Sequence, residues 1–582
     1  MISLTTAKLK EKERSSRSFS LSENNKKQAL IIFILITLVV FLVFMRFSRI
    51  TADPPPDLSW SAGYYGDEAG YAHNARNKVL FGKWMMDEYN PLYVNPILTS
   101  FDFISFKIFH PGILSLRLVA LFWGILGIFF VYGTLRKTTK SLWMVFLGIV
   151  LLETNYYFLM FTRLSLSDTM LTNCMLMTLF FWALGLRKSA FRFLAGLSAV
   201  GVLCCKPTAV YFSIVVLASF VFHYAKKEFS DPKNAKELVK YIFPYITGLL
   251  VGGCIWLFFY YIPYHKEFAE MTSGWSFLSM PRGWRDFVSR TIGPYAPIVF
   301  KHFSWFPFVL LLGWFYLPVS FYRFTKYRKA YNSLEFFVLF WFIVGYFAIS
   351  GLRYRPSRYF ISLAPPMIIL ALFGFKELTV FSYRSLKKNW IFSTLYLGWI
   401  FLTIFLIRKY IHIKPPVVYG SLIIFCLLAV ATWIFKGIFP RVEPHKKFSF
   451  YVALLIISLS LSQNFTLYYR WWHKPSYKVI NASRDVGKIV KHGIIAGLWA
   501  PMICMENRNR ALCIASGWFN DQHPYEKYHF THLFLWRGNR DAELRHVLMR
   551  PLGAKFIRER LKPIDKYLIK NAPAVLYKVK SR

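Results

Sequence analysis

Residues 29–45 read ALIIFILITLVVFLVFM and form the first of many apolar runs in this chain. A run of this kind can enter the hydrocarbon core of a membrane as a helix. Basic residues precede it, as they precede a secretory signal: Lys8, Lys10, Lys12, Arg14, Arg17, Lys26 and Lys27. We interpret the run as an uncleaved anchor, because no convincing small-residue cleavage site follows it and further apolar runs do.

Composition places the whole chain in the membrane class. The 582 residues are 55% hydrophobic with a mean hydropathy of +0.37, which is too apolar for a soluble protein of this length. About thirteen runs meet the length criterion for a span, at residues 29–48, 113–134, 141–161, 167–186, 190–205, 207–224, 240–262, 296–320, 333–351, 359–376, 390–408, 416–435 and 448–466. The sequence therefore predicts an all-α polytopic membrane domain over residues 29–469.

The distribution of charge predicts the topology. The chain has 72 Lys and Arg against 29 Asp and Glu, a formal net charge of +43, and much of the excess lies in short loops. With the basic N-terminus, residues 1–28, in the cytoplasm, each loop after an even-numbered span lies inside and is rich in Lys or Arg. The alternative, a nucleic-acid-binding protein, is disfavoured because no known binding motif accompanies the charge.

Three regions are then expected outside the cytoplasm: the first loop at 49–112, the loop at 263–295 and the chain after 467. In the first loop, residues 68–80 and 96–109 have apolar spacings that predict helices lying in the membrane interface. The loop at 263–295 carries similar aromatic residues and is a candidate for a mobile cover.

Residues 470–582 are predicted to form a small extracytoplasmic α/β domain, because the long apolar runs end there. Strand-like and helix-like stretches alternate in it: strands at 493–498, 530–535 and 574–579, helices at 477–490 and 541–549. Cys504 and Cys513 flank a turn-like segment, and they are either joined as a hairpin disulfide or left as two free thiols.

An acid pair follows the first span, in Gly63-Tyr64-Tyr65-Gly66-Asp67-Glu68-Ala69. Paired carboxylates have little structural use in a membrane loop, whereas removing a proton from an alcohol needs a base of this kind. A helix that begins here would stabilise the acid as its anion. Asp67 and Glu68 are therefore catalytic candidates, and the alternative is an ordinary acidic helix start in a solvated loop.

Charged residues recur at the next outside turns. The turn between the third and fourth spans contains Arg163 and Asp168, which suit phosphate binding or, alternatively, a local ion pair with a helix cap. The following outside turn contains Lys206 and Pro207. That lysine is a candidate phosphate contact, although a snorkelling lysine at the end of a span is the common alternative.

A later outside turn contains three arginines, Arg353, Arg355 and Arg358, and then Tyr359. Arginines here run against the positive-inside tendency, so topology does not explain them. The guanidinium group fits phosphate oxygens, which favours phosphate recognition over a surface ion network.

The order of these motifs resembles that of the polyprenyl-phosphate-sugar-dependent glycosyltransferases of the GT-C fold. The similarity is greatest to the group of protein O-mannosyltransferases and lipid A aminoarabinose transferases. It covers residues 29–470 and rests on motif order, topology and span count. The matching motifs are Gly66-Asp67-Glu68, Arg163 with Asp168, the span from Gly196 to Lys206-Pro207, and Arg355-Pro356 with Arg358-Tyr359.

The resemblance implies a sugar donor on a polyprenyl phosphate, taken from the membrane, and a lipid, glycan or protein acceptor. Asp67 would deprotonate or position the acceptor hydroxyl. Preorganised cations would stabilise the departing phosphate, and the candidates for this binding region are Arg163, Lys206, Arg353, Arg355, Arg358 and Tyr359. Asp168 would orient the acceptor, a phosphate ligand or a divalent cation, although no metal-ligand spacing occurs in the sequence.

One element of the aminoarabinose transferases is missing. Their first loop carries a Glu-Lys-Pro-Pro element, whereas the nearest stretch here, Tyr93-Val94-Asn95-Pro96-Ile97-Leu98, lacks both charges. The sequence therefore predicts a transferase whose sugar is left open. Compact loops without a eukaryotic-looking targeting element favour a bacterial inner membrane with the active face in the periplasm. The alternatives are a lipid-linked sugar transporter or flippase, and a non-catalytic scaffold that presents the C-terminal domain.

Overall fold

The computed structural model describes Phe33, Ser61 and residues 36–59, 63–139, 141–228, 235–293, 307–380, 390–407, 415–434, 447–515, 518–536 and 560–580. The chain divides into two compact units, Met1–Ser48 and Arg49–Arg582. In the first unit, the described part is a short apolar helix, Ile36–Phe47. Every element and contact below belongs to the second unit.

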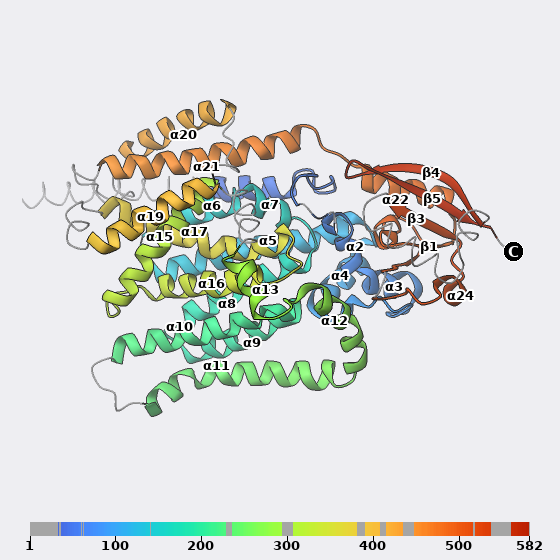
Figure 1. The fold of residues 1–582 in the computed structure, drawn as a ribbon, viewed down its shortest axis with the longest axis horizontal. Helices are drawn as coiled ribbons and strands as arrows, with labels where there is room; N and C mark the ends of the chain where they lie inside the picture. The colour runs from blue at the N-terminus through green and yellow to red at the C-terminus, as the bar shows by residue number, and fades with distance from the viewer. Residues whose placement is uncertain are drawn as a thin grey trace, which may run out of the picture. The chain divides into compact units, whose positions relative to one another are not determined.

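Long apolar helices make up most of the second unit (Figure 1). They are α5 (Ile113–Thr138), α6 (Leu142–Glu153), α7 (Tyr156–Thr162), α8 (Ser167–Gly185), α9 (Ser189–Cys205), α10 (Tyr211–Glu228), α11 (Ala235–Trp256), α15 (Pro307–Lys326), α16 (Ser333–Ser350), α17 (Ala364–Val380), α19 (Trp390–Ile407), α20 (Pro415–Ile434) and α21 (Lys447–His473). These helices support the prediction of an integral, mostly helical membrane protein.

The prediction of thirteen spans is not confirmed. Among the described residues, six helices are long and apolar enough to cross a membrane, or seven if one bent pair counts as a span. That pair is α6 and α7, which meet at a 67° bend. The helix breaks there because the Asn155 side chain accepts a hydrogen bond from the Phe158 backbone N–H and so starts α7. The predicted span at 296–320 lies partly outside the described residues.

Glycines bring α9 and α11 into close contact. A Cβ atom at Gly196 would lie 2.2 Å from the backbone oxygen of Tyr245, and one at Gly248 would lie 2.1 Å from that of Phe193. Only glycine permits two backbones to approach so closely, which is a common device between membrane helices. This packing fixes α9, whose last residue immediately precedes Lys206.

The first loop is largely helical, as its apolar spacing predicted. It contains η1 (Gly63–Tyr65), α2 (Asp67–Tyr71), α3 (His73–Phe81), η2 (Pro91–Tyr93) and α4 (Pro96–Phe109). The loop at 263–295 contains two helices, α12 (His265–Ser279) and α13 (Trp284–Thr291).

The C-terminal region contains a small mixed sheet with helices, which agrees with the predicted α/β domain. Its elements are α22 (Lys478–Ile489), β1 (Ile494–Ala496), α23 (Ala500–Ile503), β2 (Arg510–Leu512), α24 (Pro524–Tyr528), β3 (His532–Trp536), β4 (Leu561–Ile569) and β5 (Ala572–Val579). The strand order is β2-β1-β3-β5-β4, with β1 parallel to β2 and β3, and β5 antiparallel to β3 and β4. The expected helix at 541–549 lies outside the described residues.

The hairpin considered for Cys504 and Cys513 does not form. Strand β2 pairs in parallel with β1, with Ile494 opposite Arg510, and α23 occupies the connection between these strands. Both cysteines are buried free thiols. The turn-like residues between them are therefore part of a parallel crossover, and of the two alternatives the free thiols are correct.

The C-terminal domain is attached to the first loop by buried polar contacts. Asp53 accepts hydrogen bonds from the hydroxyl of Ser476 at 2.6 Å and from the backbone N–H of Lys478 at 2.8 Å, at the start of α22. The buried guanidinium of Arg76 donates to the backbone oxygens of Asn507 at 2.7 Å and Asn509 at 2.8 Å. Since both loop partners flank the acid pair in sequence, these contacts help to fix its position.

Candidate active site

Asp67 forms an ion pair with Arg358, although the two residues come from distant parts of the chain. Their side chains approach to 2.7 Å between Oδ2 and Nη2. Asp67 is the first residue of α2, and Arg358 lies in η5 (Ser357–Leu363), a 3-10 helix that leads into α17. The side chain of Asp67 keeps 29% of its surface exposed, whereas Arg358 keeps 5%. Asp67 is thus the accessible member of the pair.

Asp168 joins the same cluster from a third element. Its Oδ1 lies 2.7 Å from Nζ of Lys206, and its Oδ2 lies 3.3 Å from Nε of Arg358. Asp168 is in the first turn of α8, where the positive end of the helix dipole stabilises a carboxylate. The result is a continuous charge network, Asp67–Arg358–Asp168–Lys206, which we call the four-residue network.

Lys206 is held at the end of α9 by the chain itself. It caps that helix in an extended conformation, because Pro207 opens the following 3-10 turn and cannot continue the helix. Its ammonium group lies 3.2 Å from the centre of the Tyr359 ring, a cation–π contact. Burial lowers the pKa of Lys206 to about 8, and this lowering is opposed by the Asp168 carboxylate, which favours the charged form.

Tyr71 lies beside the network and was missed by the sequence reasoning. It interacts electrostatically with Asp67, Arg358 and Asp168, and its hydroxyl makes a hydrogen bond with Ser167. Burial, with a further contribution from the charge of Asp67, raises its pKa above the ordinary value. Asp67 and Tyr71 are four residues apart on α2, so the spacing that places two side chains on one helix face was an available signal.

Glu68 does not join the four-residue network. Its Oε2 lies 2.8 Å from Nη2 of Arg117, and its Oε1 accepts a hydrogen bond of 3.0 Å from the backbone N–H of Ser165. Both side chains of the pair are almost completely buried. Arg117 also donates to the backbone oxygens of Ile50 and Ala52. Glu68 therefore ties the first loop to α5 and to the turn before α8.

Asp102 adds a second buried carboxyl group beside Glu68. Its Oδ1 lies 3.2 Å from the hydroxyl of Ser165. Burial raises the pKa of Asp102 well above its ordinary value, and the nearby charge of Glu68 raises it further. Because burial favours its uncharged form, Asp102 differs from the two acids of the network, which are paired with cations.

Three of the expected phosphate-binding arginines lie in other contacts. Arg163 is buried, with its guanidinium 4.4 Å from the centre of the Trp471 ring. Arg355 donates to the backbone oxygen of Arg290 at 3.1 Å. Arg353 is connected through its backbone N–H, which donates to Ser279 at 2.7 Å. The role of these three arginines in phosphate binding stays a prediction.

Close packing surrounds the accessible acid. A Cβ atom at Gly63 would lie 3.1 Å from Oδ2 of Asp67 and 3.2 Å from Nη1 of Arg358. A Cβ atom at Gly66 would lie 3.3 Å from the ring of Trp499. The two glycines that precede Asp67 thus leave room for different groups: Gly63 for the ion pair and Gly66 for a tryptophan of the C-terminal domain.

Metal binding was left open by the sequence, and the network's carboxylates are the residues concerned. No group of three or more His, Cys, Asp or Glu side chains with the proximity to hold a metal occurs in the part of the chain that the structure describes. Both oxygens of Asp168 already face cations. We assign no residue to a divalent cation.

The fold is that of the GT-C membrane proteins. The structure is similar to ArnT from Cupriavidus metallidurans bound to undecaprenyl phosphate, with a TM-score of 0.53, 12% sequence identity and coverage of 94% of this chain and 97% of that one. ArnT in the apo state matches with a TM-score of 0.51, 13% identity, and coverage of 94% and 98%. The expected mostly helical, GT-C-like fold with a small C-terminal sheet is therefore confirmed, whereas the thirteen spans and the extracytoplasmic placement of that sheet stay predictions.

A family model supports the same grouping. Residues 96–251 match the family described as dolichyl-phosphate-mannose-protein mannosyltransferase. The matched segment contains Arg163, Asp168 and Lys206, but it excludes Asp67 and Arg358. No curated protein gave a match. The chain thus combines a GT-C fold of the ArnT type with a protein-mannosyltransferase-like segment that supplies half of the four-residue network.

Proposed function

We propose that the protein is an integral membrane glycosyltransferase that moves a sugar from a polyprenyl-phosphate donor to an acceptor hydroxyl or phosphate. The observation that carries this proposal is the position of Arg358 between Asp67 and Asp168, 2.7 Å from one carboxylate and 3.3 Å from the other. One cation thus contacts two carboxylates from different elements. This arrangement places a candidate base for an alcohol beside a cation that can bind phosphate.

Asp67 acts as the general base toward an acceptor hydroxyl. It is more exposed than Asp168, whose side chain keeps only 2% of its surface accessible, so it is the acid that an incoming acceptor can reach. The acceptor oxygen forms a bond to the anomeric carbon while the bond from that carbon to the donor phosphate breaks. The proton of the hydroxyl passes to Asp67, and the bonding electron pair leaves with the phosphate.

Arg358 and Lys206 stabilise the negative charge that develops on the departing phosphate. Both are held in place before the reaction by Asp168, and preorganised cations cost little reorganisation during the chemical step. Tyr359 supports Lys206 through its ring. Asp168 is on this account a positioning residue.

The remaining residues expected at the site hold its elements in position. Glu68 positions α2 through Arg117, which leaves Asp67 to face the acceptor. Arg163, Arg353 and Arg355 stabilise the surrounding turns through the contacts described above.

The donor class draws support from the comparisons. ArnT in one of the two matching structures is bound to undecaprenyl phosphate, and the family model is named for dolichyl-phosphate-mannose chemistry. A sequence identity of 12% supports a shared fold and does not identify the substrate. The proposal therefore names the donor class and assigns neither the sugar nor the acceptor. We place the reaction on the periplasmic face of a bacterial inner membrane, as the loop charges indicate.

The C-terminal domain, residues 470–582, forms one wall of the reaction site on that face. Trp499 packs against Gly66, directly before the proposed base. Lys570 reaches back to the first loop as well, donating to the backbone oxygens of Ser59 at 3.0 Å and Ser61 at 3.2 Å.

The test is release of polyprenyl phosphate from a panel of labelled polyprenyl-phosphate sugars, with membrane extract as the source of acceptor. Wild type, Asp67→Asn and a matched control, Asp57→Asn, are compared in lipid. Asp57 is an exposed acid of the same loop. Transfer by wild type and Asp57→Asn but not by Asp67→Asn supports the proposal. Equal transfer by all three contradicts the role of Asp67.

A further inference from the structure

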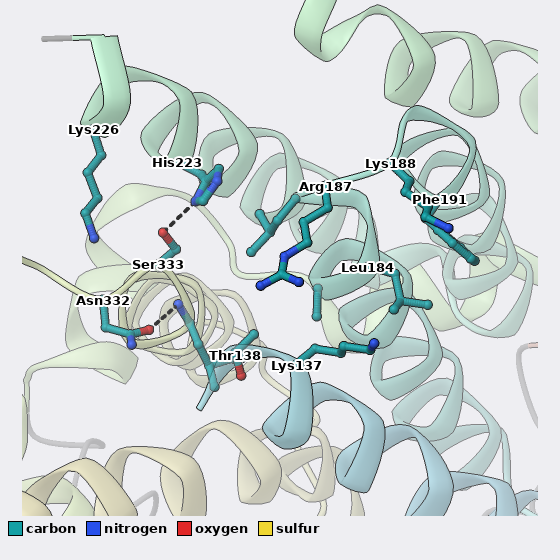
Figure 2. Close-up of a pocket in the computed structure, with 13 residues that line it drawn as sticks. Lys137, Thr138, Leu184, Arg187, Lys188, Phe191, His223, Lys226, Asn332 and Ser333 are labelled. Atoms are coloured by element: carbon teal, nitrogen blue, oxygen red, sulfur yellow. Dashed lines mark hydrogen bonds between the residues drawn. The ribbon is translucent and has the colours of Figure 1, made fainter. Parts of the chain in front are cut away.

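A basic cavity of about 640 Å³ lies between the ends of several helices (Figure 2). Four of its lining residues have basic side chains, Lys137, Arg187, Lys188 and Lys226, and His223 adds an imidazole. Among the described residues that line the cavity, none is Asp or Glu. The cavity is therefore a concave site with one sign of charge.

The cavity lies at the opposite ends of the helices that carry the candidate active site. Helix α8 has Asp168 in its first turn, and Arg187 follows its last turn. Its 19 residues give a length of about 28 Å at ~1.5 Å per residue. Helix α9 runs between Lys188 before its start and Lys206 after its end. The two sites are thus separated by about the thickness of a hydrocarbon core, ~30 Å.

Specific contacts hold two of the basic groups at the rim. Nδ1 of His223 lies 2.8 Å from the hydroxyl of Ser333, and Nζ of Lys226 donates to the backbone oxygen of Tyr331 at 2.6 Å. Figure 2 shows the guanidinium of Arg187 pointing into the space between Ser333 and Lys137. The side chains of Lys137 and Arg187 are exposed, so both can reach a ligand.

The positive-inside tendency explains why basic residues lie at this end of the helices, and helix C-termini stabilise cations such as Lys137 and Arg187. Neither effect explains why cations from α5, from α10 and from the turn between α8 and α9 line one cavity with no carboxylate among its described residues. Like charges gathered in a concave surface repel one another, and a bound anion removes that cost. Phosphate oxygens match both the ammonium and the guanidinium donors.

Apolar side chains complete the lining. Leu184 and Phe191 stand beside Arg187 and Lys188 in the same cavity. A small free anion would leave these groups in contact with water, whereas a headgroup attached to an apolar chain would cover them. We propose that this cavity is a second phosphate-binding site, which takes a phosphate-bearing group such as a lipid headgroup from the membrane leaflet opposite the candidate active site.

The test compares two charge-removing triple variants of the full-length protein. The first, Lys137→Gln/Arg187→Gln/Lys188→Gln, alters the cavity. The matched control, Arg136→Gln/Arg328→Gln/Lys329→Gln, removes three exposed basic residues outside the lining. One arm counts phosphatidylglycerol retained from mixed micelles with phosphatidylcholine by native mass spectrometry. The other arm measures inorganic pyrophosphate binding by calorimetry in phosphatidylcholine nanodiscs.

At roughly a fivefold effect for each of the three basic residues lost near an anionic group, the cavity variant should bind about a hundredfold more weakly, and the control should match wild type. Loss in the lipid arm assigns a lipid headgroup, and loss in the pyrophosphate arm alone assigns a soluble phosphate ligand. Equal weakening by both variants, or no binding of either probe to wild type, overturns the proposal. The assay uses no sugar donor, so its outcome is independent of the proposed transferase activity.

Discussion

Nη2 of Arg358 lies 2.7 Å from Oδ2 of Asp67, across 291 positions of sequence. This ion pair joins the first loop to the turn before α17. It also connects the exposed acid to the buried pair formed by Asp168 and Lys206. The proposed chemistry depends on this connection, because it places a base and two cations within one cluster.

Arg358→Lys should reduce catalysis without abolishing it. A lysine keeps the positive charge but lacks the planar fork that contacts two carboxylates at once. We expect kcat to fall about a hundredfold in Arg358→Lys and further in Arg358→Gln, measured with a polyprenyl-phosphate sugar at saturating concentration. Full activity in Arg358→Gln would show that this cation does not stabilise the departing phosphate.

Glu68→Ala should act on stability before catalysis. It leaves the guanidinium of Arg117 buried without its carboxylate, and breaking a buried ion pair in this way costs about 3–5 kcal/mol. The expected result is a clear fall in the midpoint of thermal unfolding in detergent. Glu237→Ala is the matched control, since that acid and its ion-pair partner Lys240 are both largely exposed. If both variants melt as wild type does, the Glu68 contact does not hold the first loop.

Activity should decline as the pH rises through about 8. The pKa of Lys206 is lowered to about 8, mainly by burial. The protonated cation is the form present below this pH, and it is lost above it, so its attraction for phosphate fades as pH increases. The measurement is the pH profile of kcat/KM.

Lys206→Arg supplies the control for that profile. Arginine stays protonated throughout the accessible range, so the decline near pH 8 should disappear even if the overall rate is lower. A decline of the same shape in Lys206→Arg would assign the titration to another group.

Gly63→Ala should disturb the Asp67–Arg358 pair directly. The added Cβ atom would lie 3.1 Å from the carboxylate and 3.2 Å from the guanidinium, so one of them must move. We expect kcat/KM to fall about tenfold, since small displacements of reacting groups are costly. Gly253→Ala, where a Cβ atom meets nothing within 4 Å, should leave activity unchanged. A neutral Gly63→Ala would mean that the pair tolerates displacement.

Much of the fold followed from the sequence because it depends on patterns that one chain displays locally. Apolar runs predicted the long helices, and alternating short runs predicted β1, β3 and β5. The number of spans was less predictable. Asn155 breaks one apolar run by a side-chain cap that hydropathy does not register, and several other apolar helices among the described residues, such as Ser189–Cys205, are shorter than a full span. The hairpin alternative for Cys504 and Cys513 was wrong for a different reason. Parallel pairing of β2 with β1 depends on tertiary packing, which the local sequence does not display.

The candidate site was predicted in part. The four-residue network, Asp67–Arg358–Asp168–Lys206, forms as the charges at successive turns suggested. Glu68 was expected beside Asp67 because the two are adjacent in sequence, but it pairs with Arg117 instead. Neighbouring residues on a helix point about 100° apart, so Asp67 and Glu68 face different partners. Tyr71 could have been found from its four-residue spacing to Asp67, whereas Trp499 could be found only from the position of the C-terminal domain.

The most direct test separates donor binding from chemistry in Asp67→Asn. Donor affinity and the single-turnover rate at saturating donor are measured on the same purified protein in lipid. The account predicts a dissociation constant within about threefold of wild type and a rate lowered by about a thousandfold, because a general base typically contributes 10²–10⁴-fold. An unchanged rate, or a loss of donor binding as large as the loss of rate, would contradict the assignment of Asp67 as the base.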